Sequence, residues 1–260
     1  MRYQSTTGLP KTTILEIVAR IHEVMTARGL SYRGYRFGLY KQVEITLLLL
    51  RQNMSQMVAA DMHGISQPTI SRIYRRGCAL LESVLVFTGI SLTEAIDQDH
   101  LILVDGTFVP TGNRPASGQG SANYSGKRKV QCLSIQVACT ATGELITVSN
   151  PVPGARHDAK ALELCGWTTI LNEENVNWIA DTAYIGTSAI TPIKKAPGRQ
   201  RLEWEKEFNR TIAGLRAPVE HCIAGLKNWK ILSKGYRGRL AELPGIIRIV
   251  TQLELLRTGW

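Results

Sequence analysis

The sequence predicts an α/β fold class in which an all-α helix-turn-helix module, residues 1–91, precedes an α/β domain, residues 92–260. Apolar residues recur at helical spacing through the first part, whereas from residue 101 onward they form runs of strand length between turns. The charge changes as well, with a net +6 over residues 1–91, −2 over residues 92–198 and +6 over residues 199–239. The length suits a module of roughly 90 residues ahead of one larger domain.

The whole chain is strongly basic, with 31 Lys and Arg residues against 21 Asp and Glu residues and a formal net charge of +10. This balance favours a polyanionic partner, because a positive field over a whole surface attracts long anions. The longest apolar run, residues 45–50, is far shorter than the ~20 residues that span a bilayer, so we expect no membrane segment. A polar start without a secretory signal predicts a cytoplasmic protein. The five cysteines include no Cys-x-x-Cys pair, which favours free thiols over a zinc site.

The first elements of the chain are helices. Apolar residues at helical spacing predict a helix over residues 13–27, which Gly29 ends, and a second helix from about residue 41 to residue 52. Residues 55–73 then predict two short helices joined by a tight turn, which is the pattern of a helix-turn-helix. Gly64 can take positive φ in that turn, and Ser66 is the expected N-cap of the second helix.

The second helix of this pair is expected to present polar and basic side chains to solvent, as a helix that docks in the major groove of DNA does. These side chains are Gln67, Thr69, Ser71, Arg72, Arg75 and Arg76. The alternative is an ordinary helical hairpin in a bundle, because the same small-residue spacing arises by chance. The polar and basic face favours DNA binding.

The α/β part carries acidic residues on three separate elements. Asp105 lies at the centre of an apolar strand over residues 101–109, and Asp181 ends a strand over residues 176–181. The other predicted elements are strands at 130–139 and 144–149, a helix at 158–171 and a long helical region from about 202 to 232. Arg216, Glu220, Ile223 and Lys227 share one face of that last region. Pro218 either bends this helix just before Glu220 or starts a new helix there.

In their order and spacing these residues resemble the Asp-Asp-Glu transposases, which have a ribonuclease-H-like core, and in particular the bacterial insertion sequence five group and its eukaryotic Harbinger relatives. The motifs that carry the resemblance are Asp105-Gly106-Thr107, Asp181-x-x-Tyr184-x-Gly186, Tyr124-Ser125-Gly126-Lys127-Arg128-Lys129, Gly154-x-Arg156-His157-Asp158 and Arg216-x-x-Val219-Glu220 with Lys227 seven positions later. The resemblance runs from the helix-turn-helix to the final helix. One departure is Ala213, where the bacterial pattern often has Tyr.

The resemblance implies a DNA transposase that cleaves element ends and transfers strands into target DNA. Asp105, Asp181 and Glu220 would hold two Mg²⁺ ions, with Mn²⁺ as a substitute, and Lys227 would hold a phosphate nearby. DNA contacts would also come from Lys127, Arg128, Lys129 and Arg216, and His157, Asp158 and Tyr184 would support the site. The implied partners are double-stranded DNA with terminal inverted repeats, target DNA and further copies of this chain. The expected location is the bacterial nucleoid, or the nucleus if the source is eukaryotic.

Each acidic residue also has an ordinary structural interpretation. Asp181 could start a turn, Glu220 alone could be an exposed helix residue and Asp158 could be the N-cap of the helix that follows it. Asp105 is harder to explain in that way, because it interrupts an apolar strand. At the level of function, the alternatives are a catalytically silent DNA-binding protein derived from a transposase and a helix-turn-helix regulator with a ligand-sensing domain. The presence of all three carboxylates favours the enzyme.

Overall fold

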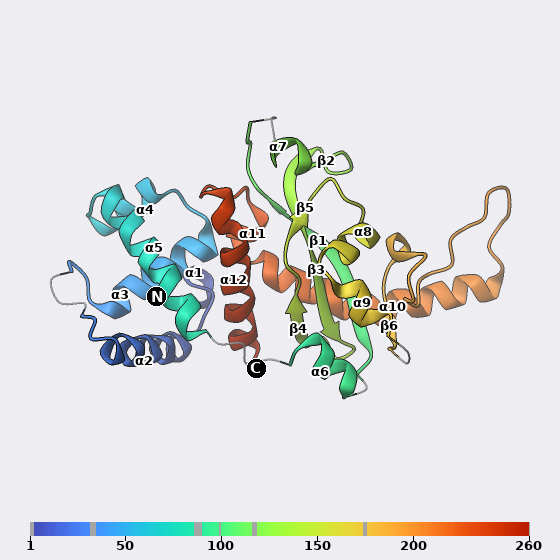
Figure 1. Ribbon diagram of the computed structural model, residues 1–260, viewed down its shortest axis with the longest axis horizontal. Coiled ribbons are helices and arrows are strands. Elements are labelled where there is room, and N and C mark those ends of the chain that lie inside the picture. The colour runs from blue at the N-terminus through green and yellow to red at the C-terminus, as the bar shows by residue number, and fades with distance from the viewer. Residues whose placement is uncertain are drawn as a thin grey trace. The chain divides into compact units, whose positions relative to one another are not determined.

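The computed structural model describes residues 3–31, 35–85, 90–98, 100–115, 119–173 and 176–259 (Figure 1). Two compact units share the chain. Unit 1 comprises Met1–Thr88 and Leu226–Trp260, and unit 2 comprises Gly89–Gly225. The expected division placed everything after residue 91 in one domain, whereas the structure groups the C-terminal segment with the N-terminal helices. Within the described segments, no helix has the length and apolar character needed to cross a bilayer.

Unit 1 is entirely helical over the residues described. Its helices are α1 (Tyr3–Thr6), α2 (Lys11–Ala27), α3 (Leu39–Gln52), α4 (Gln56–His63), α5 (Gln67–Val84), α11 (Lys230–Ser233) and α12 (Leu243–Thr258), with a 3₁₀ turn at Leu240–Glu242. Helices α2, α3 and α5 contact one another, and α4 packs on α5. Of the C-terminal helices, α11 packs on α3 and α12 packs on α5. One buried cluster joins α3, α4 and α5 through Ile45, Leu49, Ala59, Ala60, Ile70 and Ile73.

The turn between α4 and α5 follows the predicted chemistry in part. Gly64 has φ +60°, as expected, and closes α4. Ser66 occupies the N-cap position of α5, but its hydroxyl bonds with the Thr69 hydroxyl at 3.0 Å and, among the described atoms, caps no backbone N–H. Gly77 lets α5 approach α3 closely, because a Cβ there would lie 2.0 Å from the Thr46 hydroxyl oxygen.

Trp229 packs the C-terminal segment against the other helices of unit 1. Its ring is fully buried, and its indole N–H donates to Glu254 Oε2 at 3.0 Å. Gly8 lies against the ring, where a Cβ would meet a ring carbon at 2.9 Å, and the Arg51 guanidinium lies 5.3 Å from the ring centroid. Tight packing around so large a side chain explains why residues 226–260 belong to this unit.

Unit 2 is built on a mixed sheet, which confirms the predicted α/β class. Strand β1 (Ile102–Pro110) lies at its centre, antiparallel to β3 (Val130–Thr140) and parallel to β6 (Trp178–Ile179). The shorter strands β2 (Tyr124–Ser125), β4 (Leu145–Val148) and β5 (Val152–Pro153) pair with β3. The remaining elements are α6 (Leu92–Asp97), α7 (Gln119–Ala122), α8 (Asp158–Leu164), α9 (Trp167–Leu171), a 3₁₀ turn at Thr182–Tyr184 and α10 (Glu203–Lys227).

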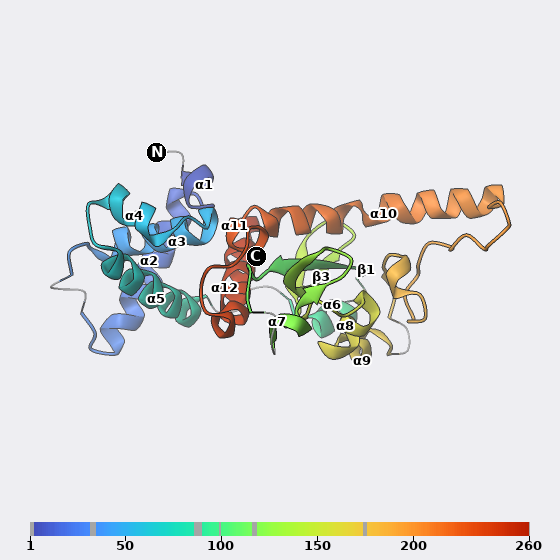
Figure 2. The same ribbon diagram turned by 90° about the horizontal axis from the view of Figure 1, so that it is seen from above.

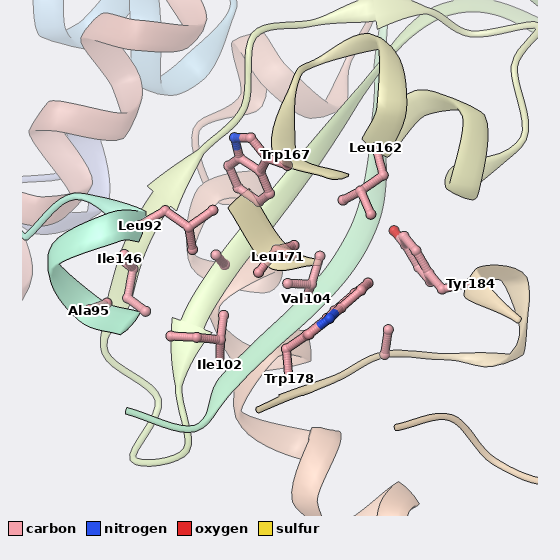
Figure 3. Close-up of a cluster of buried hydrophobic side chains, with 12 residues drawn as sticks. Leu92, Ala95, Ile102, Val104, Ile146, Leu162, Trp167, Leu171, Trp178 and Tyr184 are labelled. Atoms are coloured by element: carbon pink, nitrogen blue, oxygen red, sulfur yellow. The ribbon is translucent and has the colours of Figure 1, made fainter. Parts of the chain in front are cut away.

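One face of this sheet forms the main core of unit 2. Ile102 and Val104 of β1 project to the same face and pack with side chains from α8, α9 and the segment after β6 (Figure 3). The residues of this cluster are Leu92, Ala95, Ile102, Val104, Ala138, Ile146, Leu162, Trp167, Leu171, Trp178, Ala180 and Tyr184.

Three predicted elements differ from the structure. The single helix expected at 158–171 is two helices, because Gly166 takes φ +85° between them. The strand expected at 176–181 is paired only at Trp178–Ile179, so Asp181 lies just beyond it. The helical region expected at 202–232 ends at Lys227 and restarts at Lys230. Pro218 lies inside α10, which is continuous (Figure 2), so the alternative in which Pro218 starts a new helix is wrong.

Candidate active site

Asp105 is held at the middle of β1, on the face opposite the main core. Val104 belongs to that core, and successive side chains of a strand alternate between faces, so Asp105 points to the other side. There it meets α10: Arg216 Nη2 donates to Asp105 Oδ2 at 3.0 Å. The backbone N–H of Gly106 donates to Asp105 Oδ1 at 2.8 Å. Both carboxylate oxygens of Asp105 therefore have partners within the protein.

Asp181 is brought level with Asp105 by the parallel pairing of β1 and β6. Leu103 pairs with Ile179, and each aspartate follows two residues later on its strand. The Asp181 carboxylate accepts the backbone N–H of Ala183 at 2.7 Å and so caps the 3₁₀ turn. Burial raises the pKa of Asp105; the charge of Arg216 opposes this rise and the charge of Asp181 adds to it. The two carboxylates thus interact electrostatically.

A cleft of about 660 Å³ opens beside the two aspartates. Its lining includes Asp105, Asp181, Asp158 and His157, together with the exposed turn that carries Lys127 and Arg128. Acidic groups that can hold cations therefore face basic groups that can hold an anion. This combination suits a metal ion and a phosphate in one cleft.

Asp158 reaches the opposite face of β1 at Gly106. A Cβ on Gly106 would lie 2.8 Å from Asp158 Oδ1 and 3.1 Å from the Tyr184 hydroxyl oxygen, so only glycine fits at this position. The Tyr184 hydroxyl donates to Gln136 Oε1, whose side chain is fully buried. Burial raises the pKa of Asp158. The positive charge of Lys127 opposes this rise, and the negative charge of Asp181 adds to it. The three residues predicted to support the site therefore lie in two places. Asp158 and Tyr184 lie beside Gly106, whereas His157 is exposed in the lining of the cleft.

Glu220 and Lys227 lie on α10 but outside the lining of this cleft. Glu220 is exposed and follows Arg216 by one helical turn, which places the two on the same helix face. Lys227 is the last residue of α10 and falls in unit 1, where its Nζ donates to the Leu232 carbonyl at 3.1 Å. Among the described residues, no three His, Cys, Asp or Glu side chains lie close enough together to hold a metal ion. The structure therefore brings Asp105 and Asp181 together and leaves Glu220 apart from them.

The predicted basic contacts of unit 2 lie in the turn between β2 and β3. Lys127, Arg128 and Lys129 are all exposed, and the Arg128 guanidinium lies 4.5 Å from the centroid of the Phe108 ring. Phe108 belongs to β1, three residues beyond Asp105. This cation–π contact fixes a positive charge at the cleft. Sequence reasoning missed it, because only the pairing of β2 and β3 brings the turn over β1.

The predicted DNA-contacting side chains of unit 1 do not all project freely from α5. Arg72 and Arg75 are exposed, whereas Gln67, Thr69, Ser71 and Arg76 are half-buried. Arg76 turns back toward α3, donates to Gln42 Oε1 at 3.0 Å and lies 3.8 Å from the Tyr35 ring centroid. Gln67 donates to Gln56 Oε1 at 2.6 Å. The expected outward projection is therefore wrong for Arg76.

Comparison with known proteins identifies relatives of this chain. The family of DDE superfamily endonucleases matches residues 104–254, more than half of the sequence. A protein of Streptomyces albus G that carries the name of a transposase for insertion sequence element IS112 is 29% identical over 184 residues, 70% of this chain and 66% of that protein. A protein of Microchaete diplosiphon named as a transposase for insertion sequence element IS702 is 33% identical over 147 residues, 55% of this chain and 51% of that protein. The match thus spans less than two thirds of either relative.

Proposed function

Because the chain belongs to the DDE superfamily endonucleases, we propose that it is a DNA transposase that cleaves the ends of its element and joins them to target DNA. The observation that carries the proposal is the placement of Asp105 and Asp181 at one level of neighbouring strands, beside a cleft that also has exposed basic residues. The names of the two relatives support the same activity. The motifs of the sequence favour the insertion sequence five or Harbinger-like group.

The sheet supports a ribonuclease-H-like core in unit 2. Strands β1, β3 and β4 are antiparallel neighbours, and after a helical crossover comes β6, which is parallel to β1. Strand β1 is thereby flanked by β3 and β6, and Asp105, next to its central residue, carries a carboxylate. In a sheet of this order, carboxylates at β1 and just beyond β6 lie next to each other.

Membership in this family implies dependence on a divalent metal, and the donor set here fits one. Asp105 and Asp181 offer carboxylate oxygens, and Asp105 already holds a cation in the form of the Arg216 guanidinium. We assign the metal sites to Asp105, Asp181 and Glu220 and the metal to Mg²⁺, with two ions and Mn²⁺ as a substitute. Bound there, the ions would activate the attacking hydroxyl and stabilise the leaving oxygen of a phosphodiester.

The residues of the chain have separate roles in this mechanism. Asp105 and Asp181 would hold the metal from rigid backbone positions, since each carboxylate is also fixed by a backbone N–H. Glu220 would complete the metal site from α10, one turn beyond Arg216. Lys127, Arg128, Lys129, Arg216 and Lys227 hold substrate phosphates, and Asp158, His157 and Tyr184 support the cleft.

Unit 1 is proposed to bind double-stranded DNA through α4 and α5 as a helix-turn-helix. The support is the tight turn at Gly64 and the exposed Arg72 and Arg75 on the second helix. Terminal inverted repeats and target DNA are the proposed substrates, with further copies of this chain as partners on the DNA. The nucleoid of a bacterial cell, or a nucleus, is the corresponding place of action.

A cleavage assay tests the proposed function. The full-length chain is incubated with linear duplex DNA that contains the sequences on both sides of its coding region, in Mg²⁺, Mn²⁺ or EDTA. We expect strand cleavage at short inverted repeats with either metal and none with EDTA. DNA binding without cleavage under every condition would contradict the enzyme and favour the catalytically silent DNA-binding protein.

A further inference from the structure

The ion pair between Arg216 and Asp105 is more than a surface contact. The two side chains are only 14% and 20% exposed, and Arg216 Nη2 lies 3.0 Å from Asp105 Oδ2. Partial burial leaves such a pair poorly screened by solvent and salt. The guanidinium therefore neutralises the charge of Asp105. Arg216 lies on the same face of α10 as Glu220.

The same guanidinium has an unused donor. Arg216 Nε is buried and has no hydrogen-bond partner within the described part of the chain. A buried donor without a partner is unfavourable, and the Nε and Nη2 atoms of one arginine form the fork that binds two oxygens of a phosphate. Of these two atoms, only Nη2 bonds with Asp105. An oxyanion that accepts from both Nε and Nη2 would therefore be a better partner for this guanidinium.

A metal ion and Arg216 would compete for the same carboxylate. Asp105 Oδ1 accepts the N–H of Gly106 and Oδ2 accepts from Arg216, so a metal ion on this carboxylate would lie beside the guanidinium. A divalent cation and a guanidinium so close together repel each other. Metal binding at Asp105 is therefore more favourable when Arg216 moves away.

We propose that Arg216 is an exchangeable counter-ion, which neutralises Asp105 until a divalent metal replaces it and then binds a phosphate of the DNA substrate through its Nε and Nη2 atoms. The proposal rests on the proposed function, because it needs a metal-binding Asp105. It goes further in coupling two binding events. A DNA phosphate that captures Arg216 favours the metal, and the metal, by releasing Arg216, favours DNA by the same factor.

The exchange makes an unusual prediction for a basic residue beside a metal site. In the full-length chain, without DNA, Arg216→Gln should bind Mn²⁺ more tightly than the wild type, by about 5- to 150-fold, the usual range for coupled sites. Arg216→Lys keeps the charge and should bind Mn²⁺ close to the wild-type affinity. The measurement is isothermal titration calorimetry with MnCl₂, on variants whose circular dichroism matches the wild type.

Arg210 is the matched control for charge. It lies exposed on the same helix, and Arg210→Gln removes the same charge from the same element. Arg210→Gln should leave Mn²⁺ affinity unchanged. An equal gain in both Gln variants would show a general charge effect and overturn the exchange, as would Mn²⁺ binding by Arg216→Gln that is equal to or weaker than that of the wild type.

Addition of DNA tests the second half of the exchange. A saturating duplex from the flanks of the coding region should tighten Mn²⁺ binding by the wild type and by Arg210→Gln, and should not tighten it further in Arg216→Gln. The same DNA effect in all three proteins would overturn the coupling.

The proposed function and the exchange fail in different ways. Tighter Mn²⁺ binding by Arg216→Gln, with unchanged Mn²⁺ affinity in Arg210→Gln and no DNA cleavage by the wild type, would contradict the transposase and leave the exchange standing. Cleavage by the wild type with unchanged Mn²⁺ affinity in Arg216→Gln would contradict the exchange alone. If neither the wild type nor Arg216→Gln binds Mn²⁺, both are wrong.

Discussion

Asp158 is a half-buried carboxyl group whose environment opposes its negative charge. Burial raises its pKa, and the nearby charge of Asp181 raises it further, against the effect of Lys127. A carboxyl with a raised folded pKa stabilises the fold fully below the unfolded value of about 3.9 and loses that stabilisation as the pH rises through the folded value. At neutral pH the Asp158 carboxylate therefore costs stability, which is acceptable at a site that a cation would occupy.

Asp158→Asn should consequently raise the melting temperature at pH 7 and leave it unchanged near pH 3, where both states of the wild type are protonated. Thermal unfolding followed by circular dichroism at both pH values measures this difference. Glu163→Gln is the control, because Glu163 is exposed on the same helix and, among the described residues, forms an ion pair only with Lys160, at 2.5 Å. A lower melting temperature for Asp158→Asn at pH 7 would contradict the account of this residue.

Lys227 and Lys230 are a matched pair for testing phosphate binding. Lys227 Nζ donates to the Leu232 carbonyl at 3.1 Å, and Lys230 Nζ donates to Gln52 Oε1 at 2.6 Å. Each Ala variant thus loses at least one internal hydrogen bond, each at a cost of about 0.5–1.5 kcal/mol in stability. If Lys227 binds substrate phosphate, Lys227→Ala should slow cleavage about 10- to 100-fold and Lys230→Ala should not. Equal rates for the two variants would remove Lys227 from the site.

For single residues, the sequence predicts a functional role only where that role is visible from the strand in which the residue lies. Asp105 could be found because a charge in the middle of an apolar strand needs a partner. The Arg216 pair with Asp105 joins positions 111 residues apart, and the approach of Asp158 to Gly106 brings the start of α8 to the middle of β1. Such contacts depend on how the helices pack on the sheet, and the periodicity of apolar residues does not specify that packing.

Among the elements, helices and strands are well predicted by apolar spacing, and their interruptions are not. Gly166 breaks the helix expected at 158–171 by taking positive φ, although glycine is also tolerated inside helices. Pro218 does the opposite and remains inside α10. Proline has no backbone N–H, so the carbonyl of Gly214, four residues earlier, receives no hydrogen bond from position 218, and Gly214 is exposed to solvent. Local sequence leaves both outcomes open.

Two glycines in helices should respond oppositely to the same substitution. Gly77→Ala would place a methyl group 2.0 Å from the Thr46 hydroxyl oxygen, so the contact between α3 and α5 must open, at a cost of about 1–3 kcal/mol. Gly214→Ala meets nothing within 4 Å and should stabilise α10 by about 0.5–1 kcal/mol. Urea unfolding measures both changes. A neutral Gly77→Ala would show that α3 and α5 are less closely packed than described.

The whole molecule is organised by a chain that leaves unit 1 and returns to it. Apolar spacing predicts one continuous helical region across residue 226, so the sequence predicts a single boundary near residue 91. The structure groups them with unit 1 through buried contacts of Trp229 and of helix α12 with α5. Long-range packing of this kind is visible only in three dimensions.

Trp229→Ala should therefore destabilise unit 1, by about 3–5 kcal/mol, because the ring is fully buried. Hydrogen exchange should show lost protection in residues 1–88 and 226–260 and little change in residues 89–225. Trp204, which is 59% exposed on α10, provides the control, and Trp204→Ala should leave protection unchanged. Loss of protection confined to residues 226–260 would contradict the proposed grouping.

Asp105, Asp181 and Glu220 are proposed to form a metal-dependent cleavage centre, and of these three residues the structure brings the two aspartates together. The most direct measurement is the rate of Mg²⁺-dependent strand cleavage by Asp105→Asn, Asp181→Asn and Glu220→Gln, with DNA affinity determined on the same samples. We predict that each variant loses cleavage and keeps near wild-type DNA binding, because basic residues supply most of the affinity for DNA, and that Glu163→Gln cleaves normally. Metal-dependent cleavage by any of the three variants at the wild-type rate would contradict the claim.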